Sequence, residues 1–200
     1  NPIYVLLRYS PKGSEGEPIM TLGVHFAITD EQRKALENAA SDEDRIDYVK
    51  EVIEEEWDEE YTVESDKAWD TIHRSLGEMP PGIEWLYPVR EELGPFALPD
   101  NYGEYPLKIC ILGGKKLVEE DGNYFIRLIE PHEISDLVPA LNEIDIVELS
   151  KRYFKHCKDV WPEFGQEDFE YTWEYFVAVR EFFQKMEGNG RSVIFTASGA

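Results

Sequence analysis

The sequence predicts an α+β fold in a single domain, with a small mixed or antiparallel sheet packed against about six helices. The hydrophobic patterns run in the order strands, helices, strands, helices and a last strand, which favours α+β over a regular alternation of strands and helices. The 200 residues are 42% hydrophobic and 13% aromatic. This composition supplies a hydrophobic core, and the length suits one domain over residues 1–200.

The first strands and helices are expected before residue 60. Apolar runs at 3–9 and 22–28, separated by a Gly- and Glu-rich loop, predict two strands. Thr29 or Asp30 is expected to cap a helix through Ala40, and Ser41 with Asp44 is expected to begin the next one. That second helix shows one apolar face at helical spacing, formed by Ile46, Val49, Val52, Ile53 and Trp57.

A third helix and a long irregular connection follow. Asp66 is expected to cap this helix, whose apolar positions include Trp69 and Ile72, and Gly77 is expected to end it. Residues 78–106 then hold six of the twelve prolines. Connections of that length are uncommon in compact domains and are often functional.

The second half predicts a strand pair followed by helices. Residues 107–112 and 124–129 are expected to pair across a turn at Gly113-Gly114. Pro131 suits the first turn of a helix that runs to about Asn142, and Pro139 is expected to bend it or end it early. The remaining elements expected are helices over 145–154 and 169–187, a turn over 188–190 and a last strand over 192–196.

The charge is the strongest compositional signal. Asp and Glu number 42 against 20 Lys and Arg, a net charge of −22. Such a surface repels nucleic-acid phosphates and anionic lipids, so we expect neither as a partner. No apolar run is long enough to span a bilayer, and no signal peptide is expected, which predicts a cytoplasmic protein. Cys110 and Cys157 are expected to be reduced thiols.

Three segments together resemble a known family. They are DKAWDTIHRSLG at 66–77, the apolar runs at 109–114 and 124–129 with the helix after Pro131, and the long aromatic helix and short strand over 175–196. The chain is similar in these features to the YfbM-like family of bacterial proteins of unknown function, over about residues 20–197. This resemblance implies an α+β fold and a bacterial cytoplasmic setting, with no established activity. The first strand and the proline-rich insert at 78–106 differ from the family pattern. A less specific likeness is to acidic immunity proteins that neutralise toxins.

The acidic residues are concentrated in one segment. Residues 30–66 contain 16 acidic and 4 basic residues, a net charge of −12. A solvated helix face would explain this pattern, and so would a docking face for a basic protein such as a toxin, with aromatic anchors among the acids. The candidate partner-binding residues are Glu54, Glu55, Glu56, Trp57, Glu59, Glu60 and Tyr61.

The alternative is a small-molecule-binding domain or an enzyme with a pocket around Trp69 and His73. These residues lie four apart on one helix, where Asp66 or Asp70 would help His73 to orient a polar ligand. The competing interpretation is a hydrogen-bonded core histidine. The sequence indicates no catalytic residues, so we favour a protein that is not an enzyme.

No cofactor or metal site is expected from the sequence motifs. His132-Glu133 lacks the second histidine of a zinc helix, because Asp136 stands at that position. Gly113-Gly114-Lys115-Lys116 lacks the spacing of a phosphate-binding loop and predicts a hairpin turn with exposed lysines. The sequence does not predict an oligomeric state.

Overall fold

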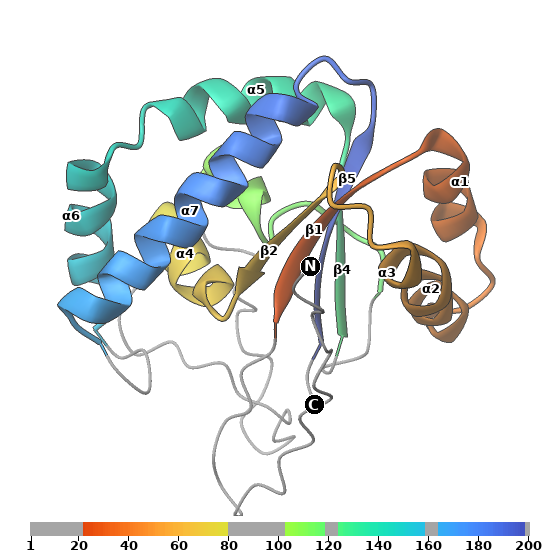
Figure 1. Cartoon of the computed structure of the whole chain (residues 1–200), viewed down its shortest axis with the longest axis horizontal. Coiled ribbons are helices and arrows are strands. Elements are labelled where there is room, and N and C mark those ends of the chain that lie inside the picture. The colour runs from red at the N-terminus through yellow and green to blue at the C-terminus, as the bar shows by residue number, and fades with distance from the viewer. Residues whose placement is uncertain (1–21, 80–102, 119–123, 159–163, 199–200) are drawn as a thin grey trace, which may run out of the picture.

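The computed structural model describes residues 22–79, 103–118, 124–158 and 164–198. Its centre is a five-stranded antiparallel sheet with the strand order β2-β1-β5-β4-β3. Helices cover both faces of the sheet, α1 to α3 on one side and α4 to α7 on the other (Figure 1). The strands are β1 (Gly23–Ile28), β2 (Thr62–Asp66), β3 (Lys115–Lys116), β4 (Tyr124–Ile129) and β5 (Ser192–Ser198). The predicted α+β class is confirmed.

Strand alternation divides the interior into two cores. Side chains of a strand point alternately to opposite faces. In β1, Val24, Phe26 and Ile28 pack toward the helices that follow that strand, whereas Ala27 packs toward the other face. Every residue of β1 is buried, as expected for a strand that is covered on both faces.

The acidic segment forms the helical layer on one face of the sheet. Helix α1 (Asp30–Asn38) begins with a capping box formed by Thr29 and Gln32. Helix α2 (Asp42–Tyr48) has the predicted Ser41 cap and continues through a π-helical turn, η1 (Val49–Ile53), into α3 (Glu54–Glu56). These three elements form one helix over residues 42–56. Counted in this way, the described residues contain six α-helices, in agreement with the prediction.

The opposite layer contains the longer helices. They are α4 (Ala68–Leu76), α5 (Pro131–Asn142), α6 (Ile146–His156) and α7 (Gln166–Met186), with a short 3-10 helix, η4 (Leu107–Cys110). Pro131 begins α5 as predicted, and Asp145 caps α6 through its carboxylate. Pro139 does not end α5, because the helix continues to Asn142. Gly188 and Gly190 adopt positive φ angles in the predicted turn before β5.

The prediction around Asp66 was wrong at the start of α4. Strand β2 was not predicted, and Asp66 is its last residue, paired with Gly23 of β1. Lys67 occupies the N-cap position, without a side-chain hydrogen bond. At the other end, Gly77 has a φ of −81°, and Glu78 adopts the left-handed conformation with a φ of 49°. The close approach here requires a glycine at 103, where φ is 97° and a Cβ would lie 2.8 Å from the Gly77 Cα.

The predicted strand over 107–112 was also wrong. These residues form η4 and a turn that are buried beneath the helices, and Ile109, Cys110, Ile111 and Leu112 are at most 2% exposed. Strand β4 pairs with β5 and with the two-residue β3 instead. A short apolar run does not distinguish a buried strand from a buried helical turn, which explains the error. The predicted strand at 3–9, its following loop and residues 80–102 of the insert lie outside the described residues.

Candidate functional site

An exposed acidic surface runs along the helix over residues 42–56 and into the turn after it. We call it the acidic ridge and define it as Glu43, Asp47, Glu51, Glu55, Glu56, Trp57, Asp58 and Glu59, all of which are exposed. None of its acidic side chains forms an ion pair with another described residue. The ridge therefore presents its negative charge to the solvent.

Two acids of the neighbouring helix α1, Asp30 and Glu37, differ from the ridge because basic side chains neutralise them. Arg33 lies 2.6 Å from both Asp30 and Glu37, and Lys34 lies 2.5 Å from Asp30. The hydrogen bond from Lys34 lowers the pKa of Asp30, and the bond from Lys115 lowers the pKa of Glu37. The excess charge of residues 30–66 is thus concentrated on the ridge.

Trp57 is the aromatic side chain of the ridge. It follows α3 in a left-handed conformation with a φ of 30°, and it is 43% exposed. A contact with the sheet holds the indole in place, because the indole packs edge-on against the Phe26 ring of β1 with 5.6 Å between ring centroids. The exposed part of Trp57 can be contacted from the solvent, and its anchor role stays a prediction.

Glu54 does not belong to the exposed surface, although it was a candidate. The π-helical turn before it gives a backbone bond from the Glu54 N–H to the Val49 carbonyl, one residue longer than in an α-helix. Glu54 then faces the sheet, where it accepts a 2.5 Å hydrogen bond from the Tyr124 hydroxyl. Burial and the Glu54 carboxylate raise the pKa of Tyr124 above its usual value. This contact attaches the end of the acidic helix to β4.

We expect the change Tyr124→Phe to loosen that attachment. The variant leaves the Glu54 carboxylate without its donor, and hydrogen bonds to charged groups contribute about 1.5–3 kcal/mol. Because Glu54 is partly exposed, a hydrogen bond from water replaces part of the lost stabilisation. We therefore expect the free energy of unfolding to fall by about 1 kcal/mol. Urea unfolding measures it, and faster hydrogen exchange at residues 50–57 should accompany it. Exchange that is equal to wild type would contradict the role of Tyr124.

Glu60 and Tyr61 are also engaged within the protein. The Arg191 guanidinium lies 3.7 Å from the centroid of the Tyr61 ring, and Lys185 donates a 2.8 Å bond to the Glu60 carbonyl. The Tyr61 carbonyl accepts from the Ala27 N–H at 2.8 Å. Of the seven predicted partner-binding residues, five are exposed, namely Glu55, Glu56, Trp57, Glu59 and Glu60. Glu60 is left out of the ridge because its carboxylate lies 3.8 Å from the Lys185 ammonium group.

The second candidate site lies on α4, and the structure places it in the core. Every residue of α4 is buried, with Trp69 at 4%, Asp70 at 3% and His73 at 1% exposure. Trp69 packs against Phe195 of β5 at 5.9 Å between ring centroids. Asp66 is half-buried and accepts a 3.4 Å bond from the Tyr175 hydroxyl. The four residues share one segment, and three of them are enclosed.

Asp70 binds a neighbour that the sequence analysis did not consider. Both of its carboxylate oxygens accept from Arg74 Nε, at 2.8 and 3.0 Å, and both side chains are at most 5% exposed. Cys157, the C-cap residue of α6, lies beside this helix and contacts the Thr71 carbonyl at 3.6 Å and the Ser75 hydroxyl at 3.5 Å. Burial raises the pKa of Cys157 to about 12, which keeps it a thiol at neutral pH. This arrangement is typical of a packed polar core.

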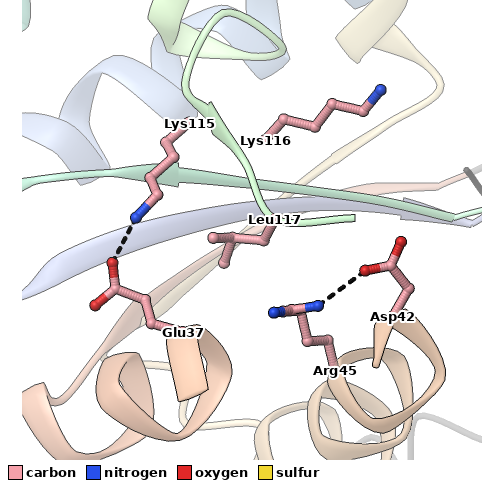
Figure 2. A pocket seen from close by; sticks show the side chains of 6 residues that line it. All are labelled: Glu37, Asp42, Arg45, Lys115, Lys116 and Leu117. Atoms are coloured by element: carbon pink, nitrogen blue, oxygen red, sulfur yellow. Dashed lines mark hydrogen bonds and ion pairs between the residues drawn. The ribbon is translucent and has the colours of Figure 1, made fainter. Parts of the chain in front are cut away.

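A third feature, a shallow pocket of about 230 Å³, was not predicted. It lies where α1 and α2 meet the edge strand β3, as Figure 2 shows. Lys115 pairs with Glu37 at 2.7 Å on one side, and Arg45 pairs with Asp42 at 2.9 Å on the other. Its lining residues are Glu37, Asp42, Arg45, Lys115, Lys116 and Leu117. The lysines predicted to be exposed in a hairpin turn thus form β3, and Lys116 is half-buried.

Two searches over the described residues complete this description. Among residues 22–79, 103–118, 124–158 and 164–198, no group of three or more His, Cys, Asp or Glu side chains is arranged to hold a metal ion. Within the same ranges, no helix combines the length and the apolar character needed to cross a membrane.

The comparisons with known proteins agree with the fold. Residues 20–196 match a family described as a domain of unknown function, DUF1877. The fold is similar to the crystal structure of YfbM from Escherichia coli, described as a protein of unknown function, with a TM-score of 0.59 and 18% sequence identity. The match covers 88% of this chain and 99% of that chain. No curated protein matches the sequence. The resemblance inferred from the sequence is thereby confirmed, and the chain belongs to the DUF1877 family of YfbM-like domains, whose function is unknown.

Proposed function

We propose that this protein is an interaction protein that binds a basic protein through the acidic ridge. The observation that supports this most is the exposed Trp57 among acids that have no ion-pair partner in the described part of the chain. An exposed aromatic residue surrounded by charges of one sign offers both burial and electrostatic complementarity to a partner. An immunity-type inhibitor that covers the cationic site of a toxin is the form of this function that we favour.

The acidic ridge is expected to raise the association rate of a partner more than the affinity of the complex. Its charges lie on a helix attached to the sheet by Glu54 and Tyr124, so they are presented in a fixed orientation. Unpaired surface charges raise the rate at which an oppositely charged partner approaches, and salt screens this effect. Trp57 would contribute mainly to the lifetime of the complex, because an indole also attracts lysine and arginine cations.

The alternative pocket around Trp69 and His73 has less support. A ligand would have to reach side chains that are 4% and 1% exposed. In contrast, the residues of the acidic ridge are already exposed, so a basic partner would bind them without any rearrangement of this protein.

We expect neutralisation of the ridge to slow the association of a basic partner. The partner is first isolated from a lysate of the source cell and purified, and association is then followed by stopped-flow fluorescence of the tryptophans. In the variant Glu51→Gln, Glu55→Gln, Glu56→Gln and Glu59→Gln, the association rate at low salt should fall about tenfold and depend less on ionic strength.

A matched control variant removes the same number of charges from α7. Glu167→Gln, Glu174→Gln, Glu181→Gln and Glu187→Gln change exposed residues on the opposite helical layer. The control should keep the wild-type rate and salt dependence. Equal slowing in the two variants would show that net charge, and not the ridge, attracts the partner. An unchanged rate in the ridge variant would overturn the proposal.

A further inference from the structure

We propose that the shallow pocket between α1, α2 and β3 binds a free α-amino acid with a small apolar side chain. Its volume of about 230 Å³ is below the range of roughly 300–1,000 Å³ that is usual for ligand pockets, so only a small molecule fits. Charged side chains of both signs surround an apolar side chain, Leu117, in its centre (Figure 2). This inference does not depend on the proposed docking role of the acidic ridge.

The charges favour a zwitterion over a simple anion or cation. Lys115 and Arg45 provide positive charge on the walls, and Glu37 and Asp42 provide negative charge. Lys116 lines the pocket at the strand, but its ammonium group points away from the other lining side chains (Figure 2). The net charge of −22 repels an anion from the whole molecule, and the acids elsewhere on the surface compete for a cation. A free amino acid carries a carboxylate and an ammonium group and has no net charge. It is therefore neither repelled as an anion nor drawn to the other surface acids as a cation, and its two charged groups complement the basic and acidic side chains of the pocket.

The ion pair at the pocket can be exchanged for a ligand. Glu37 accepts from Lys115 through one carboxylate oxygen, at 2.7 Å, and from Arg33 through the other, at 2.6 Å. If Lys115 turns to the carboxylate of an amino acid, Glu37 therefore stays paired with Arg33. The Lys115 side chain is 58% exposed, and exposed ion pairs contribute little, so the exchange costs little.

Arg45 keeps the opposite wall in place. Its Nε donates to the Leu36 carbonyl at 3.0 Å, and its second terminal nitrogen donates to the Ala39 carbonyl at 3.2 Å. These bonds join the end of α1 to the start of α2, while the third nitrogen holds Asp42 at 2.9 Å. The guanidinium is thus preorganised, whereas Lys115 is free to reorient toward a bound molecule.

A titration of the wild-type protein tests the ligand class. The ¹⁵N-labelled protein is titrated with L-valine, with isovalerate, which lacks the ammonium group, and with isobutylamine, which lacks the carboxylate. We expect saturable shifts of the amides at 36–45 and 115–117 with a millimolar dissociation constant for valine, and affinities for both fragments about tenfold weaker. Fragments that bind as tightly as valine, or shifts that are absent or located elsewhere, would overturn the proposal.

Variants test the site independently of the ligand class. Lys115→Gln should weaken valine binding by at least about fivefold, because the ligand carboxylate loses its donor. Lys151→Gln on α6 removes another exposed, ion-paired lysine far from the pocket and should leave binding unchanged. Valine binding by the Lys115→Gln variant that equals wild type would contradict the assignment. If that variant does not fold, the comparison of valine with its fragments still decides the question.

Discussion

Replacing Asp70 by asparagine should lower the free energy of unfolding by about 3–5 kcal/mol, the largest effect we expect from a single change. The carboxylate of Asp70 accepts two hydrogen bonds from Arg74, and both side chains are at most 5% exposed. The variant replaces the charged acceptor of Arg74 by a neutral amide, so the buried guanidinium loses the attraction of the Asp70 carboxylate. For a chain of this length the melting temperature should fall by about 10 °C.

A second variant separates the ion pair from the packing of α4. Replacing both members, Asp70→Leu with Arg74→Met, removes both charges together, and apolar replacement of a buried pair is often neutral. Most of the loss caused by Asp70→Asn should therefore be recovered in the double variant. Urea unfolding of the two variants and of the surface control Glu167→Gln makes the comparison. A single variant as stable as wild type would show that the pair contributes little.

Burial of His25 should lower the free energy of unfolding in acid, and this is the second-largest effect that we expect. Its ring is completely buried among Phe182, Phe183 and Phe195. One ring nitrogen, Nε2, lies 2.8 Å from the Cys110 carbonyl, and the other, Nδ1, has no hydrogen-bond partner among the described residues. This geometry fixes the neutral tautomer that donates from Nε2. Desolvation lowers the pKa of His25 from 6.5 to about 4 in the folded protein.

The direction of the pH effect follows from this difference in pKa. Above pH 6.5 the imidazole is neutral in both the folded and the unfolded chain, so it causes no pH dependence there. Between pH 6.5 and about 4 the unfolded chain binds a proton that the folded protein does not, and stability falls as the pH falls. The full loss through this residue, reached below pH 4, is about 3 kcal/mol.

The variant His25→Gln isolates this contribution. An amide can still donate to the Cys110 carbonyl, but it does not titrate, so the variant should lose less stability than wild type between pH 7 and pH 4.5. Its absolute stability at pH 7 is not the readout; the difference in pH dependence is. His132→Gln, at an exposed position, is the control and should follow the wild-type curve. Parallel curves for His25→Gln and wild type would refute a buried neutral histidine.

The sequence by itself determined the elements whose signals are local. Thr29 and Ser41 have side chains that bond to backbone groups three residues on, so the starts of α1 and α2 were predictable from residues in the same turn. Strands β1, β4 and β5 were predicted because their apolar runs are bounded by polar residues and turns. The α+β class followed from the order of these elements.

The tertiary structure decided the elements and sites whose partners are distant in the chain. Strand β2 has a weak apolar pattern and is stabilised by pairing with β1, which no short window contains. The apolar run at 107–112 became a buried turn because the β4 edge pairs with β3 and β5 instead. Tertiary contacts override local strand propensity when a strand and a helical turn bury the same side chains.

The same reason explains which candidate residues stay exposed. Glu54 is removed from the acidic ridge by Tyr124, 70 positions later, and Tyr61 is covered by Arg191 from the other end of the chain. Composition predicted the excess of acidic charge on this segment. Only the fold decided which charges are neutralised by neighbours and which face the solvent, because an ion pair depends on distance in space and not on separation in sequence.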